Sequence, residues 1–515
     1  MCGILFSNKR DYTELQFKRA LAEMRHRGPD SSDHYLFCPR GRMKLGHNRL
    51  KILDLNDSAN QPFFSQSKKH VIIYNGEIYN FRELTRQFNL HLHTYCDTEL
   101  IIELYELIGV DLLQYLNGDF AFVITSLDTG EFFVARDRLG VKPLYYIDDL
   151  QYFTCASEIA PLVTLLGHVE FDEEGLRQYK KMRTFFHGKT LYKNIKMFLP
   201  GHYRVNDKLY RYWQLPEQPQ SPPTDEELRS LISTAVDYRC ISDVPVGSYL
   251  SGGVDSTIVA SLLNKPDTWT VGFSDMNEFE WGKLAAESCK AHHTEIVMQD
   301  AEFFELARAM IIQRKEPLSV PNEVMLYKMT RAAKAHNTVI LSGEGADELF
   351  FGYDRIFHWA NQFEWNVEDF EELYTYGTEK DVEIIDAVLA PYFKYKRNID
   401  MIARFFQLDH LHGLLRRLDN SAMLASVEAR VPFVDHRIIE RMVGVSFDYR
   451  MQDGVVKAPL KRAFSDLLPK EIIERKKIGF PVPLNRLFQL ATDNKKAGFD
   501  AWFDFNLSVI QECLM

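Results

Sequence analysis

Two short runs of small, hydroxyl and acidic residues have the composition of a binding site for phosphate groups. The first run, SGGVDS, spans residues 251–256. Glycines let the backbone approach a phosphate closely, and hydroxyls and free N–H groups at a helix start donate hydrogen bonds to it. A carboxylate in this loop would repel phosphate unless a cation lay between them, so Asp255 suggests a Mg²⁺ ligand. The alternative is a plain turn, which is the commoner fate of serine–glycine runs.

The second run, SGEGADELFFGY, spans residues 342–353 and repeats this logic. Ser342 and Gly343 would expose backbone to a phosphate, and Asp347 could share the metal ion with Asp255. The alternative is a solvated helix start, where carboxylates are common because they complement the helix dipole.

A predicted strand precedes each run, and a predicted helix follows the first. Strand-like residues at 244–250 and 339–341 precede the two runs, and apolar residues at helical spacing (258, 259, 262 and 263) follow the first. A further strand is predicted over 269–273. Ligands of α/β sheets bind beyond the carboxyl ends of strands, so these strand ends are expected to carry the site.

A cysteine at position 2 suggests a different chemistry. If Met1 is removed, Cys2 carries a free α-amino group with an unperturbed pKa of about 8, beside a thiol of about 8.5. A nucleophile and its general base would then lie in one residue, which is the N-terminal nucleophile arrangement. The alternative is an inert structural thiol, which is much the more common kind of cysteine.

Size and composition exclude several classes of protein. The 515 residues, 46% of them hydrophobic, are enough for two or three domains. The net charge is -11, with no dense basic cluster, so no nucleic acid is expected as a partner. The seven cysteines include no C-x-x-C pair, which argues against disulfides and a zinc site. Neither a membrane span nor a signal peptide is recognised, and we expect a cytoplasmic protein.

The chain divides into two predicted domains. Short β-rich runs between residues 118 and 160 indicate stacked antiparallel sheets. Residues 214–223 carry four prolines among polar residues and are interpreted as a linker. Thr224 and Glu227 have capping-box spacing, which predicts a helix at the start of the second domain. The expected domains are therefore 1–213 and 224–515.

The amino-terminal domain resembles the class II glutamine amidotransferases. Its motifs occur in the order seen in that family: MCGI (1–4), RHRGPD (25–30), GHNRL (46–50), YNGEIYN (74–80) and DTE (97–99). The resemblance implies an αββα glutaminase sandwich of the N-terminal nucleophile type, with Cys2 as its nucleophile.

The same resemblance assigns roles in glutamine binding and hydrolysis. The side chain of Asn75 and the N–H of Gly76 would form the oxyanion hole for thioester formation. Arg49 would bind the carboxylate of glutamine and Asp97 its ammonium group, with Glu77 in the same pocket. The alternatives are a hairpin turn at Asn75-Gly76 and solvated surface charges at Arg49 and Asp97.

The run at 251–256 resembles the pyrophosphate loop of ATP pyrophosphatases, and the whole order of motifs is similar to the glutamine-hydrolysing asparagine synthetase family. That family implies a carboxyl-terminal α/β domain of the adenine nucleotide α-hydrolase type with added helices, an ammonia tunnel and a homodimer. It also implies ATP and Mg²⁺, with Asp255 and Asp347 on the metal. The expected ATP contacts are Leu250, Ser251, Gly252, Gly253, Asp255, Ser256, Val271, Gly272, Ser342 and Gly343.

The resemblance extends to catalytic residues of the second domain. Glu344 would act as a base on the incoming ammonia, and Lys477 would neutralise charge that develops during adenylation. Lys457 is a less certain phosphate neighbour, and a solvated surface is the alternative for the basic run around Lys477. Residues 426–435 resemble a helical segment of the family, whose charged residues are interpreted as structural.

One segment departs from the asparagine-specific pattern. Those members carry Thr-Thr-x-Arg-Ala-Ser in the aspartate pocket, whereas residues 316–323 read EPLSVPNE, without an arginine. Glu316 and Glu323 could still hold an ammonium group. The acceptor is therefore expected to be aspartate or another carboxylate, such as a sugar acid or a specialised metabolite. A relative without glutaminase activity and a non-catalytic metabolite sensor are further alternatives, which the intact Cys2 and Asp255 argue against.

Overall fold

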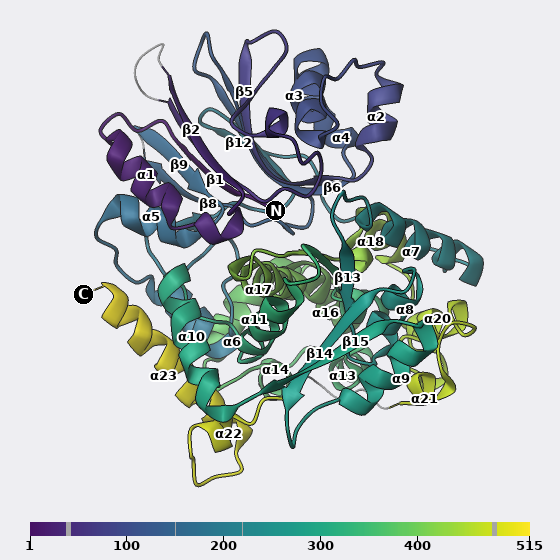
Figure 1. Cartoon of the computed structure of the whole chain (residues 1–515). Helices are drawn as coiled ribbons and strands as arrows, with labels where there is room; N and C mark the ends of the chain where they lie inside the picture. Colours follow the sequence, from purple (N-terminus) through teal and green to yellow (C-terminus); the bar gives the residue numbers. More distant parts are fainter. Residues whose placement is uncertain (38–42, 150, 219, 476–480, 515) are drawn as a thin grey trace.

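Two antiparallel six-stranded sheets stack face to face in the amino-terminal domain, as the short β-rich runs predicted (Figure 1). The computed structural model describes residues 1–37, 43–149, 151–218, 220–475 and 481–514. The first sheet has the order β10 (Lys196–Met197), β8 (Tyr145–Asp149), β9 (Tyr152–Ala156), β1 (Gly3–Ser7), β3 (Met43–Arg49) and β2 (Ser31–Phe37). The second has the order β12 (Lys208–Arg211), β11 (His202–Val205), β7 (Phe132–Arg136), β6 (Gly118–Ser126), β5 (His70–Ile78) and β4 (Phe63–Phe64).

Apolar side chains from both sheets form the core between them. Ile4 and Phe6 from β1 meet Ile73 from β5 and Val123 from β6, and all four are buried. Alternation along each strand leaves the opposite faces for helices. Helices α1 (Glu14–Ala22) and α5 (Ile159–Leu166) cover the first sheet, and α2 (Phe81–Gln87), α3 (Asp97–Ile108) and α4 (Leu112–Tyr115) lie by the second. The αββα sandwich is confirmed.

The carboxyl-terminal domain is built on a parallel sheet. Its order is β15 (His292–Met298), β14 (Asp267–Phe273), β13 (Val246–Tyr249), β16 (Val339–Leu341) and β17 (Glu428–Arg430). The helices packed around it include α7 (Asp225–Arg239), α8 (Val254–Ser261), α9 (Phe279–Cys289), α10 (Asp300–Arg314), α11 (Asn322–Ala333) and α12 (Ala346–Phe350). The α/β class and the strands predicted before both polar runs are confirmed.

Added helices enlarge this domain, as expected. A separate apolar core joins α13 (Asp354–Gln362), α14 (Val367–Tyr374), α15 (Val382–Leu389) and α16 (Asn398–Phe405). A π-helix (Phe406–His410) then leads into α17 (Leu411–Leu424), which packs against α11 and lies toward the amino-terminal domain (Figure 1). The remaining helices of this domain are α18 (His436–Met442), α19 (Phe447–Arg450), α20 (Ala458–Ala463), α21 (Lys470–Glu474), α22 (Leu484–Leu487) and α23 (Lys495–Leu514). Helix α6 (Glu173–Met182) precedes the linker and packs against α15.

The start of the second domain agrees with the capping prediction. Helix α7 begins at Asp225, and the Thr224 hydroxyl accepts a hydrogen bond from the Glu227 N–H at 3.1 Å. No strand or helix occurs in the described part of the linker, 214–218 and 220–223. Among the described residues, no helix is long and apolar enough to cross a membrane.

The prediction of a helical segment over residues 426–435 is wrong. Glu428–Arg430 forms the edge strand β17, in which Glu428 pairs with Val339 and Arg430 with Leu341. Pairing with an existing strand satisfies this backbone, and Pro432 then allows only a short 3₁₀ turn, Pro432–Val434. The change matters because a strand at this place directs its charged residues toward the other domain.

Candidate active sites

The amino terminus lies where the two domains meet (Figure 1), and Cys2 directly precedes β1. Its backbone nitrogen donates to Asn75 Oδ1 at 2.9 Å, and Arg27 Nε donates to its carbonyl oxygen at 3.0 Å. Burial raises the pKa of the Cys2 thiol. Met1 is present in this chain, and its ammonium group contacts Glu428 Oε2 at 2.9 Å. Removal of Met1 would turn the Cys2 nitrogen into the free amine that the N-terminal nucleophile mechanism needs.

Asn75 and Gly76 lie inside a strand, so the hairpin-turn alternative is wrong. They pair with Ala121 and Phe120 of β6. Asn75 Nδ2 is buried and has no hydrogen-bond partner among the described residues, so it is available as a donor to a developing oxyanion. A Cβ atom on Gly76 would lie 2.2 Å from the carbonyl oxygen of Asp119, so only glycine fits there.

Two buried carboxylates line the pocket that also contains Cys2 and Gly76. Asp97 Oδ2 accepts from the Tyr74 hydroxyl at 2.7 Å and the Ile78 N–H at 2.8 Å. Burial raises the pKa of Asp97, and these hydrogen bonds only partly oppose it, leaving the pKa at about 6. Burial and the charge of Asp97 also raise the pKa of Glu77, whose Oε1 has no hydrogen-bond partner among the described residues. The pair can accept an ammonium group.

Arg49 lies in the wall of the same pocket and is 4% exposed, so it is not a solvated surface charge. Its Nη1 donates to the Asn56 carbonyl at 2.8 Å and to Asn60 Oδ1 at 2.7 Å, and its Nη2 donates to the carbonyls of Leu53 and Asp54. A bound carboxylate would have to share these donors. The assignment of Arg49 to the glutamine carboxylate stays a prediction.

The second domain completes the wall of the Cys2 pocket, which sequence analysis missed. Glu428 lines the pocket, and Arg430 Nη2 donates to Glu77 Oε2 at 3.0 Å. Arg430 Nε also donates to Glu428 Oε1 at 2.7 Å, and Lys142 Nζ lies 4.0 Å from the same oxygen. These four charges are buried. Glu428 and Arg430 lie hundreds of residues from Glu77 and Lys142 in the sequence. Strand β17 brings the two pairs together.

The two polar runs form neighbouring loops at the carboxyl edge of the parallel sheet. Strands β13 and β16 pair directly, with Ser248 opposite Leu341. A Cβ atom on Gly343 would lie 3.0 Å from both Asp255 Cβ and the Ser256 nitrogen, so the loops touch. Gly252 has φ +72° and lies against the backbone of Trp281, so the first loop requires glycine there.

Lys457 lies between the carboxylates of Asp255 and Asp347. Lys457 Nζ contacts Asp347 Oδ1 at 2.6 Å and Asp255 Oδ2. Burial lowers the pKa of Lys457, but the two carboxylates outweigh it and raise the pKa above its usual value. Two carboxylate ligands suit Mg²⁺, which takes its other ligands from substrate phosphates and water. The described residues contain no cluster of three or more potential metal ligands, and the assignment of Mg²⁺ to this pair stays a prediction.

Glu344, in the second loop, is paired with an arginine. Arg417 Nη2, from α17, donates to Glu344 Oε1 at 2.9 Å, and each side chain is about one-fifth exposed. Glu348, four residues on, accepts from the Tyr353 hydroxyl at 2.6 Å. Burial, followed by the charges of Asp347 and Glu344, raises the pKa of Glu348 to about 8. Glu344 is the more accessible carboxylate of the two.

Lys477 lies outside the described residues. Its neighbour Arg475 reaches the first loop, where Nη1 donates to the Gly252 carbonyl at 3.1 Å. Arg475 also pairs with Glu278 and lies 4.6 Å from the centre of the Trp281 ring. The basic run therefore starts beside the loop, and Lys457 is the described lysine that contacts both carboxylates.

The segment 316–323 does not offer free carboxylates to an acceptor. Arg314 pairs with Glu316 at 3.0 Å and with Glu323 at 2.8 Å, and Arg416 adds a contact to Glu316 at 3.3 Å. Glu323 Oε1 also accepts from the Ser319 N–H at 2.5 Å. The expectation that Glu316 and Glu323 hold an ammonium group therefore does not agree with the structure.

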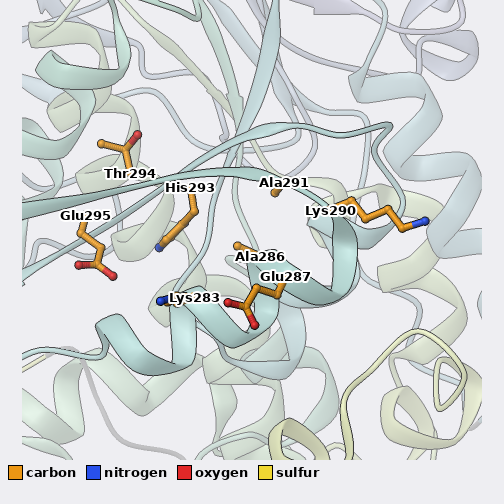
Figure 2. A pocket seen from close by; sticks show the side chains of 8 residues that line it. All are labelled: Lys283, Ala286, Glu287, Lys290, Ala291, His293, Thr294 and Glu295. Atoms are coloured by element: carbon orange, nitrogen blue, oxygen red, sulfur yellow. The ribbon is translucent and has the colours of Figure 1, made fainter.

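An open hollow of about 670 Å³ between α9 and β15 is a different feature (Figure 2). It is lined by Lys283, Lys290, Glu287 and Glu295, a mixture of both charges. It lies beside residues 292–295, at the amino ends of β14 and β15. Because ligands of parallel sheets bind at the carboxyl ends, we assign no part of the chemistry to it.

Two family models match different parts of the chain. Residues 227–495 match the family model described as asparagine synthase, and residues 1–213 match the model described as glutamine amidotransferase domain. Asparagine synthetase B [glutamine-hydrolyzing] of Escherichia coli is 30% identical over 93% of this chain and 82% of its own length. Asparagine synthetase [glutamine-hydrolyzing] 1 of Bacillus subtilis is 29% identical over 89% of this chain and 82% of its own.

A solved glutamine phosphoribosylpyrophosphate amidotransferase from Bacillus subtilis gives a weaker match. It is 16% identical, covers 57% of this chain and 65% of its own, and has a TM-score of 0.33, too low to support an argument. The family models and the sheets themselves carry the assignment. The chain belongs to the asparagine synthase family, as a carbon–nitrogen ligase in which a glutamine amidotransferase domain is joined to an ATP-dependent asparagine synthase domain.

Proposed function

We propose that this chain hydrolyses glutamine at Cys2, passes the ammonia to the second domain, and there amidates a carboxylate that ATP has adenylated. Residues 1–213 would perform the first reaction and 224–515 the second, with 214–223 as the linker. The observation that carries the proposal is the position of Glu428 and Arg430. Both residues belong to the synthetase sheet, and at the same time Glu428 lines the Cys2 pocket and Arg430 binds Glu77 in the pocket wall, which joins the two domains at this site.

In the first reaction, the amine of processed Cys2 takes the thiol proton and the sulfur attacks the amide carbon of glutamine. Asn75 Nδ2 is the buried donor available to the resulting oxyanion. Collapse of the tetrahedral intermediate releases ammonia and leaves a thioester, which water hydrolyses to glutamate. Asp97 and Glu77 supply the negative charge that holds the substrate ammonium group.

In the second reaction, the loops at 251–256 and 342–345 would hold the phosphates of ATP. Asp255 and Asp347 would bind Mg²⁺, which supplies charge neutralisation for the phosphates when bound. Lys457 would move from the carboxylates to a phosphate oxygen as the nucleotide enters. Glu344 would take a proton from the ammonia nitrogen as it attacks the acyl-adenylate, with release of AMP.

Aspartate is the first candidate acceptor, because the relatives are named as asparagine synthetases. A different carboxylate is the second candidate, and a specific observation favours it. The segment 316–323 lacks an arginine, and its two glutamates are bound to Arg314. A free α-carboxylate and α-ammonium both need partners, since burying either ion unpaired is costly.

A panel assay tests the proposal and separates the acceptors. The purified chain is incubated with ATP, Mg²⁺, glutamine and one carboxylic acid at a time, and AMP, pyrophosphate and glutamate are measured. AMP that depends on aspartate, with asparagine as product, would establish the first candidate. AMP with another acid and none with aspartate would establish the second. ADP and phosphate as products would refute adenylation.

The family resemblance also supports a homodimer as part of this proposal. Light scattering of the purified chain would measure the mass in solution. A mass near twice the 60.0 kDa of one chain is expected.

A further inference from the structure

We propose that Asp419, a residue of the synthetase domain, is a positioning residue for the glutaminase nucleophile Cys2 and acts through Arg27. The inference rests on the proposed function, because it assigns a role within the glutamine-hydrolysing site. It goes beyond that function by making the geometry of Cys2 depend on helix α17 of the other domain.

The contacts form an unbroken chain between the domains. Arg27 Nη1 donates to Asp419 Oδ2 at 2.9 Å and Nη2 donates to Oδ1 at 3.4 Å, so the pair is two-pronged. Arg27 Nη1 also donates to Glu158 Oε1 at 3.0 Å. The remaining guanidinium nitrogen, Nε, donates to the Cys2 carbonyl at 3.0 Å. Each group of donors on Arg27 is thus used.

Burial limits how far the side chains of Arg27 and Asp419 can move. Arg27 is 0% and Asp419 4% exposed, so neither ion can exchange its partner for bulk water. A two-pronged pair fixes the plane of a guanidinium group, and that plane fixes the direction of the Nε–H bond. Burial lowers the pKa of Arg27, but the charges of Asp419 and Glu158 outweigh it and raise the pKa above its usual value.

Cys2 is consequently held through both polar groups of its backbone. Arg27 holds its carbonyl oxygen, and Asn75 Oδ1 accepts from its nitrogen, the atom that becomes the general base. The cysteine side chain has a single rotatable bond before sulfur, so the backbone position sets where the thiol can lie. A displacement of about 1 Å in such a site costs on the order of 10²-fold in rate.

Helix α17 contacts both sites. Arg417, two residues before Asp419, pairs with Glu344 beside the ATP loops. Residues two apart on an α-helix point about 200° apart, so the helix presents one to each site. The glutaminase nucleophile is therefore fully supported only when α17 is seated between the domains.

The test compares Asp419→Asn with a matched control, Glu371→Gln. Glu371 forms another buried ion pair between the domains, with Lys181 Nζ at 2.6 Å, but it does not contact either site. Asp419→Asn is expected to lower kcat for glutamine hydrolysis by about 10- to 100-fold with little change in KM. Amidation supported by ammonium salts should stay within about twofold, and Glu371→Gln should leave both activities within about twofold.

Two further measurements separate positioning from general stability. Asp419→Glu keeps the charge and is expected to recover most of the lost turnover. Labelling of Cys2 by a chloroketone analogue of glutamine, followed by mass spectrometry of the processed full-length chain, should slow in Asp419→Asn in parallel with kcat. It should remain at the wild-type rate in Glu371→Gln.

The possible failures are distinguishable. Wild-type protein that neither hydrolyses glutamine nor reacts with the chloroketone would refute the proposed function and this inference with it. Wild-type protein that does both, while Asp419→Asn matches it, would refute the positioning role alone. Equal losses of glutamine-dependent and ammonia-dependent synthesis, or no recovery in Asp419→Glu, would show a purely structural contact and would overturn the proposal.

Discussion

The two sites of this chain hold their charged groups in opposite ways. Around Cys2, the charges are buried, paired across the domain boundary and attached to strands whose backbone is already hydrogen-bonded, as for Glu77 in β5 and Arg430 in β17. Around the ATP loops, Ser251 is exposed and the carboxylates are partly exposed, and Lys457 occupies the space between Asp255 and Asp347.

This difference follows from what each site must bind. Glutamine brings one ammonium and one carboxylate, and the wall of the Cys2 pocket already contains the carboxylates of Asp97 and Glu77 and the guanidinium group of Arg49. ATP brings several negative charges together with a cation, so loops at strand ends with exposed N–H groups are better suited. We infer that the glutaminase site is organised before its substrate arrives, whereas the synthetase site exchanges Lys457 contacts for ligand contacts.

The largest effect is expected from removing the nucleophile. Cys2→Ala should lower glutamate release from glutamine by ~10⁴-fold or more, because removal of a nucleophile leaves only binding and oxyanion stabilisation. Synthesis from ammonium salts should persist, since the second site keeps all its groups. Cys155→Ala, a buried thiol in β9, is the control. A Cys2→Ala protein that still hydrolyses glutamine would contradict the division between the sites.

Removing one of the loop carboxylates should give the reciprocal result. Asp255→Asn is expected to lower pyrophosphate formation by ~10³-fold, on the scale of losing one strong electrostatic contact in a transition state. Hydrolysis of glutamine should stay within about twofold, because Cys2, Asn75 and Asp97 do not contact Asp255. Both rates can be measured on one preparation. A parallel fall of the two activities would show that the sites are not separable.

The sequence predicts the parts of each site that are local. Cys2 at the chain start, the Asn75-Gly76 pair and the loops after β13 and β16 carry their chemistry in adjacent residues, and strand–loop–helix patterns locate them. The αββα sandwich and the parallel sheet follow from the same patterns and from the family resemblance. The assigned roles of Arg49 in substrate binding and of Asp255 in metal binding stay predictions.

The parts that could not be predicted depend on contacts between distant segments. Nothing local distinguishes Glu428 as a strand residue facing the Cys2 pocket, because its pairing with Val339 is set by tertiary structure. Asp419 meets Arg27 across 392 residues for the same reason. Sequence reasoning also gave Lys457 only a minor role, because a lone lysine does not reveal that it meets Asp255 and Asp347. The assignment of Lys477 stays a prediction.

A smaller effect, on stability, is expected from Lys457→Met. This variant tests whether Lys457 occupies the position that the metal ion takes at the ATP loops. Without the ammonium group, Asp255 and Asp347 face each other, so the free energy of unfolding should fall by about 3 kcal/mol, the scale for breaking a buried ion pair. Addition of Mg²⁺ should raise the Tm of the variant more than that of the wild type. Equal shifts in the two proteins would contradict a shared position for the lysine and the metal ion.

The smallest effect concerns the charge of Asp97 and tests whether the glutaminase pocket is truly preformed. Burial holds the pKa of Asp97 at about 6, above the 3.8 of an exposed aspartate. A raised pKa means that the folded protein binds this proton more tightly than the unfolded chain. Its contribution to stability is therefore full below about pH 3.8 and is lost as pH rises through 6.

At neutral pH the pocket thus carries an ionised carboxylate at some cost in stability, and the ammonium group of glutamine offsets that cost on binding. The KM for glutamine should rise as pH falls below about 6, by at most about tenfold per pH unit, because the ionised fraction falls at that rate. In Asp97→Asn, the KM should be higher at pH 7 and should lose this dependence, while the Tyr74 and Ile78 donors keep an acceptor. Steady-state hydrolysis between pH 5 and 8 measures both. A wild-type KM that stays constant across this range would show that Asp97 does not hold the substrate ammonium, and the pocket would then owe its charge to Glu77 alone.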